Sequence, residues 1–318
     1  MFALNDRVFF QDKQNDVLTV GELLVDLISA DYDDGAEEAA YHKFFGGSPA
    51  NIAMNVRKLG IVSQVAAAVG DDRFGSFLID RLAAAGIEPE YVERVDYSTS
   101  MVLLNKSKSS PIPIFYRSAD YQLSLTDKLA EALQHSKIMH FSCWPISMHP
   151  ARSTIERMIE LASRQRILIG FDPNYHSMLW QKGENGVDYV KSIISKADIV
   201  KPSDDDAERL FGKDTPDNQI KKFLQLGAKL VILTMGKDGA LVSNGVETVA
   251  FHTLAKEVAD TTGAGDAFWS GFYASLVKGY TIRESISLGF AVSAYKLRYT
   301  GAVVNLPQLD VIKTIYGL

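Results

Sequence analysis

The sequence of 318 residues has one cysteine, no apolar run of membrane-spanning length and no excess of basic residues. Cys143 cannot form a disulfide within the chain, which favours a reducing compartment. A spanning helix needs about 20 consecutive apolar residues. The 33 Lys and Arg against 39 Asp and Glu give a net charge of −6, which argues against electrostatic binding to nucleic acid. We therefore expect a soluble, cytoplasmic protein without a nucleic-acid or membrane partner.

Short apolar runs alternate with amphipathic stretches along most of the chain, and 47% of the residues are hydrophobic. The amphipathic stretches predict helices, the first with Ser48 as its N-cap, and the apolar runs predict buried strands. The helices are expected at 49–59, 72–85, 149–165 and 217–227, and the strands at 17–21, 64–70, 137–142, 167–172, 197–202 and 229–236. This alternation is typical of an α/β protein whose mostly parallel sheet carries helices on both faces.

Two segments, at about 22–45 and 97–117, break the alternation with short pieces of alternating polar and apolar residues. Such pieces predict half-exposed antiparallel strands. They could form a small second sheet, either as an edge extension of the main sheet or as a lid over a cleft. Because exposed sheet edges can pair with another chain, a homodimer and a monomer both remain open.

The segment DTTGAGDAFWSGF (260–272) carries the most chemical information. Gly263, Ala264 and Gly265 leave their backbone N–H groups accessible at the start of a helix, where the helix dipole favours an anion. Asp266 follows in the first turn, and its carboxylate would repel a bound phosphate. That placement makes sense if Asp266 accepts a proton from an attacking hydroxyl while the N–H groups hold the transferred phosphoryl group. The alternative is a tight turn with Asp266 as a helix-favouring acid.

This segment resembles the C-terminal signature of the PfkB carbohydrate kinases, which have the ribokinase-like fold. The other features of that family follow in order as VGELLVDL (20–27), GGSPANIAMNVRKLG (46–60) and TMGKDGALV (234–242). The resemblance implies one kinase domain over 1–318, with a central, mostly parallel sheet, helices on both faces and a small β-sheet lid. It also implies ATP with Mg²⁺ and a small sugar as the bound molecules.

The sugar end of the expected cleft involves two early motifs. Gly46 and Gly47 allow a close backbone approach, while Asn51 and Asp26 offer the donors and acceptors that a polyhydroxylated ligand needs. The resemblance implies that Asp26, Gly47 and Asn51 hold sugar hydroxyls. Without the resemblance, Asn51 could equally make a helix-start hydrogen bond and Asp26 could be an exposed strand acid.

The segment IFYRSAD (114–120) is similar to the lid of fructokinases and 2-keto-3-deoxygluconate kinases. In those enzymes an aromatic side chain and an arginine reach the sugar, which here implies Phe115 and Arg117. The alternative for Arg117 is a solvated side chain on an edge strand.

The segment FDPNYHSMLW (171–180) matches the same subfamilies at Asp172, a candidate substrate-binding residue, and at Asn174. His176 stands where these subfamilies usually have an arginine. A histidine lacks the permanent charge and planar fork of an arginine at neutral pH. Either His176 supplies a weaker phosphate-side contact, or another residue has that role.

The nucleotide end is expected where Thr234, Gly236 and Gly239 follow a strand, because ligands bind beyond the carboxyl ends of parallel strands. The resemblance implies that Thr234 and Gly236 contact the nucleotide. A plain hairpin between 229–236 and 239–244 is the alternative.

The segment KPSDDDAERL (201–210) is similar to the family's N-x-x-E segment, which acts through magnesium and phosphates. Lys201 and Ser203 are candidate nucleotide-binding residues, and Ser203 replaces the Asn as in fructokinases. Asp206 replaces the Glu and is one methylene shorter, so a water-mediated magnesium contact is expected. Alternatively, the three consecutive acids favour a helix N-terminus.

The resemblance also implies a monovalent-cation loop, with K⁺ as the cation and Asp260, Thr262 and Gly301 as its parts.

We therefore expect phosphoryl transfer from MgATP to a sugar hydroxyl, with Asp266 as general base and the N–H groups of Ala264, Gly265 and Asp266 as charge stabilisers. Fructose is the first expected substrate, followed by 2-keto-3-deoxygluconate, and then ribose or a nucleoside. A Rossmann dehydrogenase is disfavoured, because the first strand leads into GELLVD rather than G-x-G-x-x-G. A sugar-sensing protein with the same fold is the non-enzymatic alternative.

Overall fold

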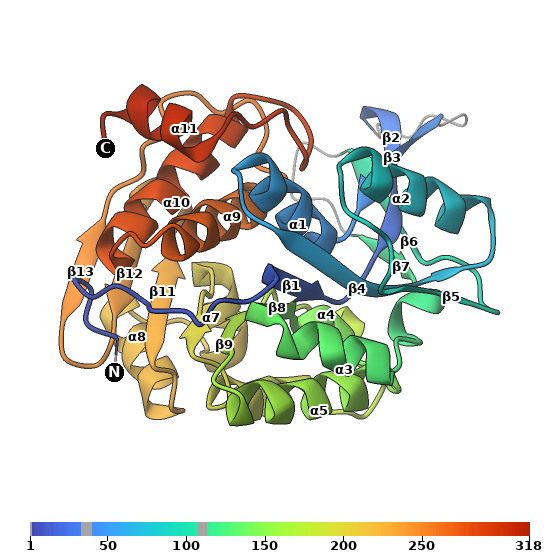
Figure 1. Ribbon diagram of the computed structural model, residues 1–318, viewed down its shortest axis with the longest axis horizontal. Helices are drawn as coiled ribbons and strands as arrows, with labels where there is room; N and C mark the ends of the chain where they lie inside the picture. Colours follow the sequence, from blue (N-terminus) through green and yellow to red (C-terminus); the bar gives the residue numbers. More distant parts are fainter. Residues whose placement is uncertain (1, 33–39, 107–112) are drawn as a thin grey trace.

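The computed structural model describes residues 2–32, 40–106 and 113–318, so parts of both expected lid segments lie outside the described residues. A nine-stranded sheet runs through the middle of the molecule in the order β13-β12-β11-β10-β9-β8-β1-β4-β5 (Figure 1). Every neighbouring pair from β11 to β5 is parallel, and β12 and β13 add antiparallel strands at one edge. The strands are β1 (Asn15–Val20), β4 (Ser63–Gly70), β5 (Val92–Val95), β8 (Ser136–Ser142), β9 (Leu168–Asp172), β10 (Ile199–Val200), β11 (Leu230–Thr234), β12 (Ala240–Ser243) and β13 (Thr248–Phe251).

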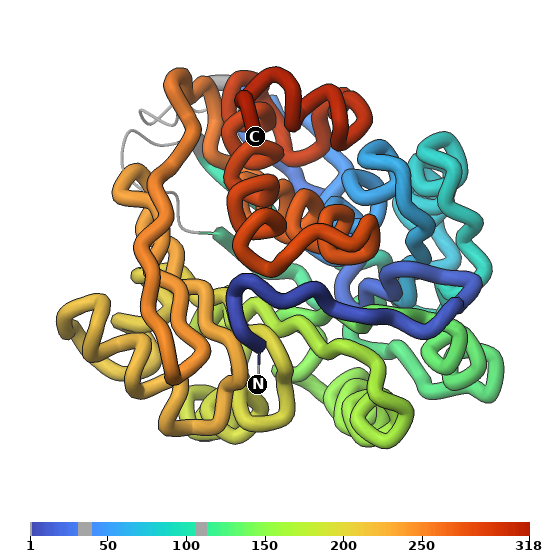
Figure 2. The backbone as a smooth tube through the Cα atoms, turned by 60° about the vertical axis from the view of Figure 1, so that its left-hand side comes forward, coloured from blue at the N-terminus to red at the C-terminus, as the bar shows by residue number. Residues whose placement is uncertain are grey.

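Helices cover both faces of this sheet, as the alternation predicted (Figures 1 and 2). One face packs against α1 (Ser48–Lys58), α2 (Arg73–Ala84), α9 (Ala264–Val277), α10 (Ile282–Leu297) and α11 (Leu309–Tyr316). The other face packs against α3 (Asp127–Gln134), α4 (Cys143–Ile146), α5 (Ala151–Arg164), α6 (Gly186–Ile194), α7 (Asp204–Phe211) and α8 (Pro216–Gln225). Burial of apolar side chains on both faces is the main stabilising contribution.

All the predicted strands and helices form, with small differences at their ends. The strand predicted over 197–202 contains only β10, because Pro202 cannot donate a ladder hydrogen bond. The prediction of Ser48 as an N-cap is wrong. Gly47, with φ +114°, occupies that position, and the Ser48 hydroxyl bonds to a distant helix instead.

A second, four-stranded sheet stands beside α2 in the order β3-β2-β6-β7. Its strands are β2 (Leu24–Tyr32), β3 (Tyr41–Gly46), β6 (Met101–Lys106) and β7 (Ile114–Tyr116). The predicted small sheet is therefore confirmed, but β2 and β6 pair in parallel, so the expectation of antiparallel strands is wrong for that pair. The physical reason is that these two strands come from separate excursions of the chain, which leave the main sheet in the same direction.

None of the helices within the described residues has the length and apolar character that crossing a membrane requires.

Candidate active site

Asp266 lies in the first turn of α9, on the wall of a cavity of about 820 Å³. The cavity opens where β9, β10 and β11 end, which is where parallel sheets bind ligands. Gly263 is the N-cap of α9 with φ +73°, and a Cβ there would come within 2.7 Å of the Ala302 Cα. The turn therefore requires glycine. It leaves the N–H groups of Gly265 and Asp266 without a protein acceptor within the described residues. The Ala264 N–H, which the sequence also assigned to charge stabilisation, donates instead to the Thr261 carbonyl at 3.1 Å. The cavity is lined by these predicted residues: Asp172, Lys201, Ser203, Asp206, Thr234, Gly236, Gly239, Gly263, Ala264, Gly265 and Asp266.

Two side chains from α1 hold the Asp266 carboxylate. The Ser48 hydroxyl donates to Oδ1 at 2.6 Å, and the Asn51 amide donates to Oδ2 at 3.0 Å. Burial raises the pKa of Asp266, and these two hydrogen bonds partly oppose that rise. The result is a fixed carboxylate with a raised pKa, as a general base requires. Asn51 bonds to Asp266 instead of serving as the helix-start cap.

Lys201 and Asp172 form a buried ion pair at the cavity wall, with Nζ 3.0 Å from Oδ2. The Trp269 indole also donates to Asp172 Oδ2 at 2.8 Å. A Cβ placed on Gly265 would lie 3.6 Å from Lys201 Nζ, so the ammonium group lies beside the glycine turn. The structure thus pairs a residue predicted for the nucleotide with one predicted for the substrate, and adds a positive charge to the anion site.

The turn after β11 forms the opposite side of the cavity. Thr234, Gly236 and Gly239 line it, and the hairpin between β11 and β12 is also present. The plain hairpin and the cavity-lining turn, which were alternatives in the sequence analysis, are therefore compatible, because the turn of the hairpin faces the cavity. Phe268 of α9 and Phe290 of α10 add apolar surface to the lining of the same cavity.

Asp206 has a structural role in the capping box of α7. Its Oδ2 accepts from the backbone N–H and the hydroxyl of Ser203, and its Oδ1 accepts from the Tyr175 N–H. Asp206 therefore stabilises the N-terminus of α7, which was the alternative interpretation of this acidic segment. Asp204 and Asp205 are exposed, and both line the cavity. No cluster of three or more His, Cys, Asp or Glu side chains suited to a metal ion occurs within the described residues.

Asp260, Thr262 and Gly301 lie together but outside the lining of the main cavity. Asp260 Oδ1 accepts from the Thr262 N–H and hydroxyl, and Oδ2 accepts from the Gly301 N–H at 2.7 Å. Lys296 donates to the Asp260 carbonyl at 2.7 Å. These bonds join the loop before α9 to the loop after α10.

Asp26 and Gly46 face each other on the second sheet, away from the lining of the main cavity. A Cβ on Gly46 would overlap the Asp26 carboxylate, so glycine is what leaves room for that acid. Burial raises the pKa of Asp26 to about 7, which does not fit the alternative of an exposed strand acid.

Arg117 is buried in a network of its own, so its interpretation as a solvated residue is wrong. Its guanidinium pairs with Asp120 at 2.6 Å and donates to the Ser147 hydroxyl at 2.6 Å. The Trp144 indole donates to the same Asp120 oxygen. Each guanidinium nitrogen has a protein acceptor, so the predicted sugar contact would have to compete with these bonds.

Phe115 and His176 meet edge to face, with ring centroids 5.4 Å apart. Phe115 also packs against Trp144 at 5.1 Å. Burial lowers the pKa of His176, and Arg209 adds to the effect, which favours the neutral imidazole. His176 therefore differs in charge from the arginine expected at its position.

The sequence did not predict Ser48 as a hydrogen-bond donor to Asp266, and it did not predict Glu22 as a buried acid near the site. Glu22 is 4% exposed, accepts the Ser48 N–H at 3.2 Å through Oε1, and has no partner for Oε2 within the described residues. Burial raises its pKa to about 8, and the nearby carboxylates of Asp120 and Asp266 add to that rise. The sequence feature that could have identified Glu22 is an acid directly after a buried strand, in GELLVD.

The chain is similar to known proteins over most of its length. The profile of the pfkB family carbohydrate kinases matches residues 14–309. A Thermoanaerobacterium thermosaccharolyticum protein named ATP-dependent 6-phosphofructokinase is 62% identical over 318 residues, covering 100% of this chain and 99% of that protein. The structure of Halothermothrix orenii fructokinase is 40% identical with a TM-score of 0.77, covering 86% of this chain and 97% of the other. Probable fructokinase-5 of Arabidopsis thaliana is 30% identical and covers 92% of this chain and 94% of that protein. The sequence motifs led us to expect a fructokinase. The 62% identical relative is instead named a 6-phosphofructokinase.

Proposed function

The chain belongs to the pfkB family of carbohydrate kinases and is an ATP-dependent sugar kinase, and we propose that its acceptor is fructose 6-phosphate. The observation that carries the chemistry is the Asp266 carboxylate, fixed by Ser48 and Asn51 beside the N-terminus of α9. The choice of acceptor is supported by the 62% identity, over the full length, to a protein named ATP-dependent 6-phosphofructokinase.

In the proposed reaction, Asp266 accepts the proton of the attacking sugar hydroxyl as that oxygen bonds to the terminal phosphorus of ATP. ADP leaves from the opposite side. The N–H groups of Gly265 and Asp266 hold the negative charge of the transferred group, and the Lys201 ammonium adds a positive charge beside them. Asp26, Gly47 and Asn51 bind the sugar, and the second sheet acts as a lid that keeps water away from the phosphoryl group.

Mg²⁺ fits the donor set of the cavity. Magnesium is usually held by nucleotide phosphates, waters and one or two carboxylates, and Asp204 and Asp205 supply exposed carboxylates on the cavity wall. When bound, the ion neutralises phosphate charge. Because protein N–H and O–H donors already surround Asp206, we assign it the positioning of α7 rather than the water-mediated magnesium contact expected from the sequence.

Fructose is the second candidate acceptor, supported by the 40% identity to Halothermothrix orenii fructokinase. A 2-keto-3-deoxy acid is less favoured, because the Arg117 charge that could bind its carboxylate is already paired with Asp120.

The test is a steady-state comparison of the three acceptors with ATP, scored by ADP release and by identification of the phosphorylated product. We expect kcat/KM for fructose 6-phosphate to exceed that for fructose by at least about 100-fold, because a site built for a polar group rejects an analogue that lacks it. A higher kcat/KM for fructose would overturn the choice of acceptor but not the kinase chemistry. Sugar binding without ADP release would overturn both.

A further inference from the structure

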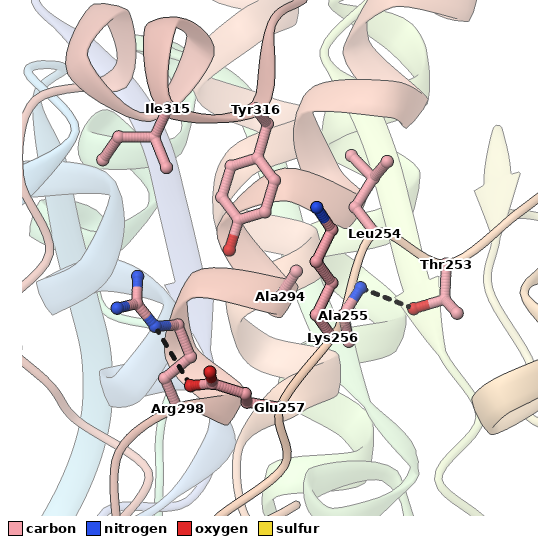
Figure 3. A pocket seen from close by; sticks show the side chains of 9 residues that line it. All are labelled: Thr253, Leu254, Ala255, Lys256, Glu257, Ala294, Arg298, Ile315 and Tyr316. Carbon is pink, nitrogen blue, oxygen red and sulfur yellow. Dashed lines mark hydrogen bonds and ion pairs between the residues drawn. The ribbon is translucent and has the colours of Figure 1, made fainter.

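A second cavity, of about 450 Å³, lies between α10, α11 and the segment 253–257 (Figure 3). Thr253 and Ala255 line both this cavity and the one around Asp266. The segment therefore borders both cavities. No residue assigned above to the reaction lines this second cavity.

Two cationic side chains and one carboxylate line the second cavity. Arg298 Nε lies 4.0 Å from the Glu257 carboxylate, and the Glu257 side chain is 78% exposed, so this ion pair is weak. Lys256 has no ion pair within the described residues. In the view of Figure 3, the Tyr316 ring stands between the Arg298 and Lys256 side chains. An incoming anion could thus replace Glu257 on Arg298 at little cost.

Backbone donors of the same segment are also free. The N–H groups of Leu254, Lys256 and Glu257 have no acceptor within the described residues, whereas the Ala255 N–H donates to the Thr253 hydroxyl at 3.1 Å. Successive unpaired N–H groups beside cationic side chains are a recurrent way of binding phosphate.

The rest of the lining is apolar or aromatic. Ala294 is buried at the base, and Leu254, Ile315 and the Tyr316 ring supply the walls. Burial raises the pKa of the Tyr316 hydroxyl, and the nearby Arg298 opposes that rise. A ligand would therefore meet cations, N–H groups, apolar surface and an aromatic ring in one cavity.

We propose that this cavity binds a phosphate monoester with a flat, ring-shaped organic part, and that its occupancy regulates nucleotide binding through the shared segment. The phosphate pairs with Arg298 and accepts from the N–H groups of Lys256 and Glu257, the Lys256 ammonium adds a second positive charge to the cavity, and the ring packs on Tyr316. The phosphate thereby ties the segment to α10, whose Phe290 and Leu297 line the nucleotide side of the main cavity. Because an ordered wall lowers the cost of binding the nucleotide, occupancy lowers the KM for ATP.

The binding test uses phenyl phosphate on the full chain, measured by isothermal titration with a non-hydrolysable ATP analogue saturating the main cavity. Inorganic phosphate and phenol serve as half-ligands, and each is expected to bind at least about tenfold more weakly than phenyl phosphate. Arg298→Ala should weaken phenyl phosphate binding by about tenfold or more, since it removes a charge-assisted hydrogen bond. The matched control is Arg283→Ala, which removes another arginine of α10 whose glutamate partner, Glu247, lies 3.6 Å away, and it should bind like the wild type.

Two results of this titration would overturn the site. One is an absence of phenyl phosphate binding up to about 10 mM, and the other is equal binding by the wild type and Arg298→Ala. Neither depends on which sugar is phosphorylated, so failure of this inference is distinct from failure of the proposed function.

The proposed effect of the second cavity on the KM for ATP is tested by steady-state kinetics with whichever sugar the enzyme phosphorylates. Phenyl phosphate should lower the KM for ATP about fivefold in the wild type and in Arg283→Ala, and should leave Arg298→Ala unaffected. Without phenyl phosphate, Arg298→Ala should match the wild type. An unchanged KM at saturating phenyl phosphate would overturn regulation. An altered KM for Arg298→Ala alone would show that the cavity is an extension of the ATP site, which also overturns the proposal.

Discussion

The hydroxyl of Ser48 donates a 2.6 Å hydrogen bond to Oδ1 of Asp266, across 218 positions of the chain. This bond joins the N-terminus of α1 to the first turn of α9, so the helix that carries Asn51 also orients the proposed base. An acceptor hydroxyl that approaches Asp266 therefore shares a carboxylate oxygen with Ser48 or Asn51, or displaces one of them.

Replacing Asp266 with asparagine should lower kcat by at least about 100-fold, because a general base contributes ~10²–10⁴-fold. Asparagine keeps the shape of the side chain but cannot accept the proton, so sugar affinity should stay within a few-fold of the wild type. Steady-state kinetics and isothermal titration of the sugar measure the two effects. Asp310→Asn, at an exposed acid in the first turn of α11, is the control. Turnover by Asp266→Asn close to the wild-type rate would remove Asp266 from the mechanism.

Ser48→Ala should shift the acid limb of the kcat/KM profile to higher pH. The Ser48 hydrogen bond lowers the pKa of Asp266 against the rise caused by burial, so removing it lets that pKa rise further. A hydrogen bond to a charged group is worth about 1.5–3 kcal/mol, which corresponds to a shift of about 1–2 pH units. Ser287→Ala, which removes a hydroxyl from α10, should leave the profile unchanged. A shift to lower pH would contradict this account of the pair.

Glu22→Gln should make the free energy of unfolding less sensitive to pH. Burial raises the pKa of Glu22 to about 8, above its unfolded value, so its contribution to stability is complete below about pH 4.5 and is lost as the pH rises through 8. The wild type should therefore lose of the order of 3–5 kcal/mol relative to Glu22→Gln between pH 4.5 and 9. Urea unfolding at several pH values measures the difference, with the exposed Glu88→Gln as the control. If the free energy of unfolding varied with pH in the same way for the wild type and Glu22→Gln, the raised pKa of Glu22 would be disproved.

Arg117→Ala should destabilise the fold by about 3–5 kcal/mol, because it leaves the fully buried Asp120 carboxylate without its counter-charge. Arg94→Ala breaks the exposed ion pair with Asp71 and should cost less than about 1 kcal/mol. Denaturant unfolding of both variants gives the comparison. A variant of Arg117 with wild-type stability and a raised KM for the sugar would instead support the direct sugar contact that the motif implies.

Gly263→Ala should reduce both stability and kcat, because the new Cβ would meet the Ala302 Cα and the residue has a positive φ. Gly279→Ala is the matched control, since Gly279 has φ +82° but open space around the position of a Cβ. The control isolates the cost of the backbone conformation, about 1 kcal/mol. Gly263→Ala should exceed that cost and also lower kcat by displacing the N–H groups of α9. Equal stability and turnover in the two variants would show that the close approach of Ala302 is unimportant.

The strands and helices followed from the sequence because their signals are local. Period-two and period-3.6 patterns depend only on which side chains face the core, so the alternation alone predicted the main sheet and its two helical layers. The glycine turn before Asp266 could also be predicted from the sequence, since its small residues directly precede a helical segment and leave backbone N–H groups accessible. The parallel pairing of β2 and β6 was not predictable in this way, because it depends on how two distant excursions of the chain return to the same edge.

By itself, the sequence determined the fold class, the family and the presence of an acid at an open helix N-terminus, because each is encoded by neighbouring residues. Only the tertiary structure showed that Ser48 and Asn51 hold that acid, that Asp120 neutralises Arg117, and that Glu22 is buried at the N-terminus of α1. These relationships join residues that lie far apart in the sequence or that depend on burial, and the raised pKa of a carboxyl group comes from the surroundings that folding builds around it.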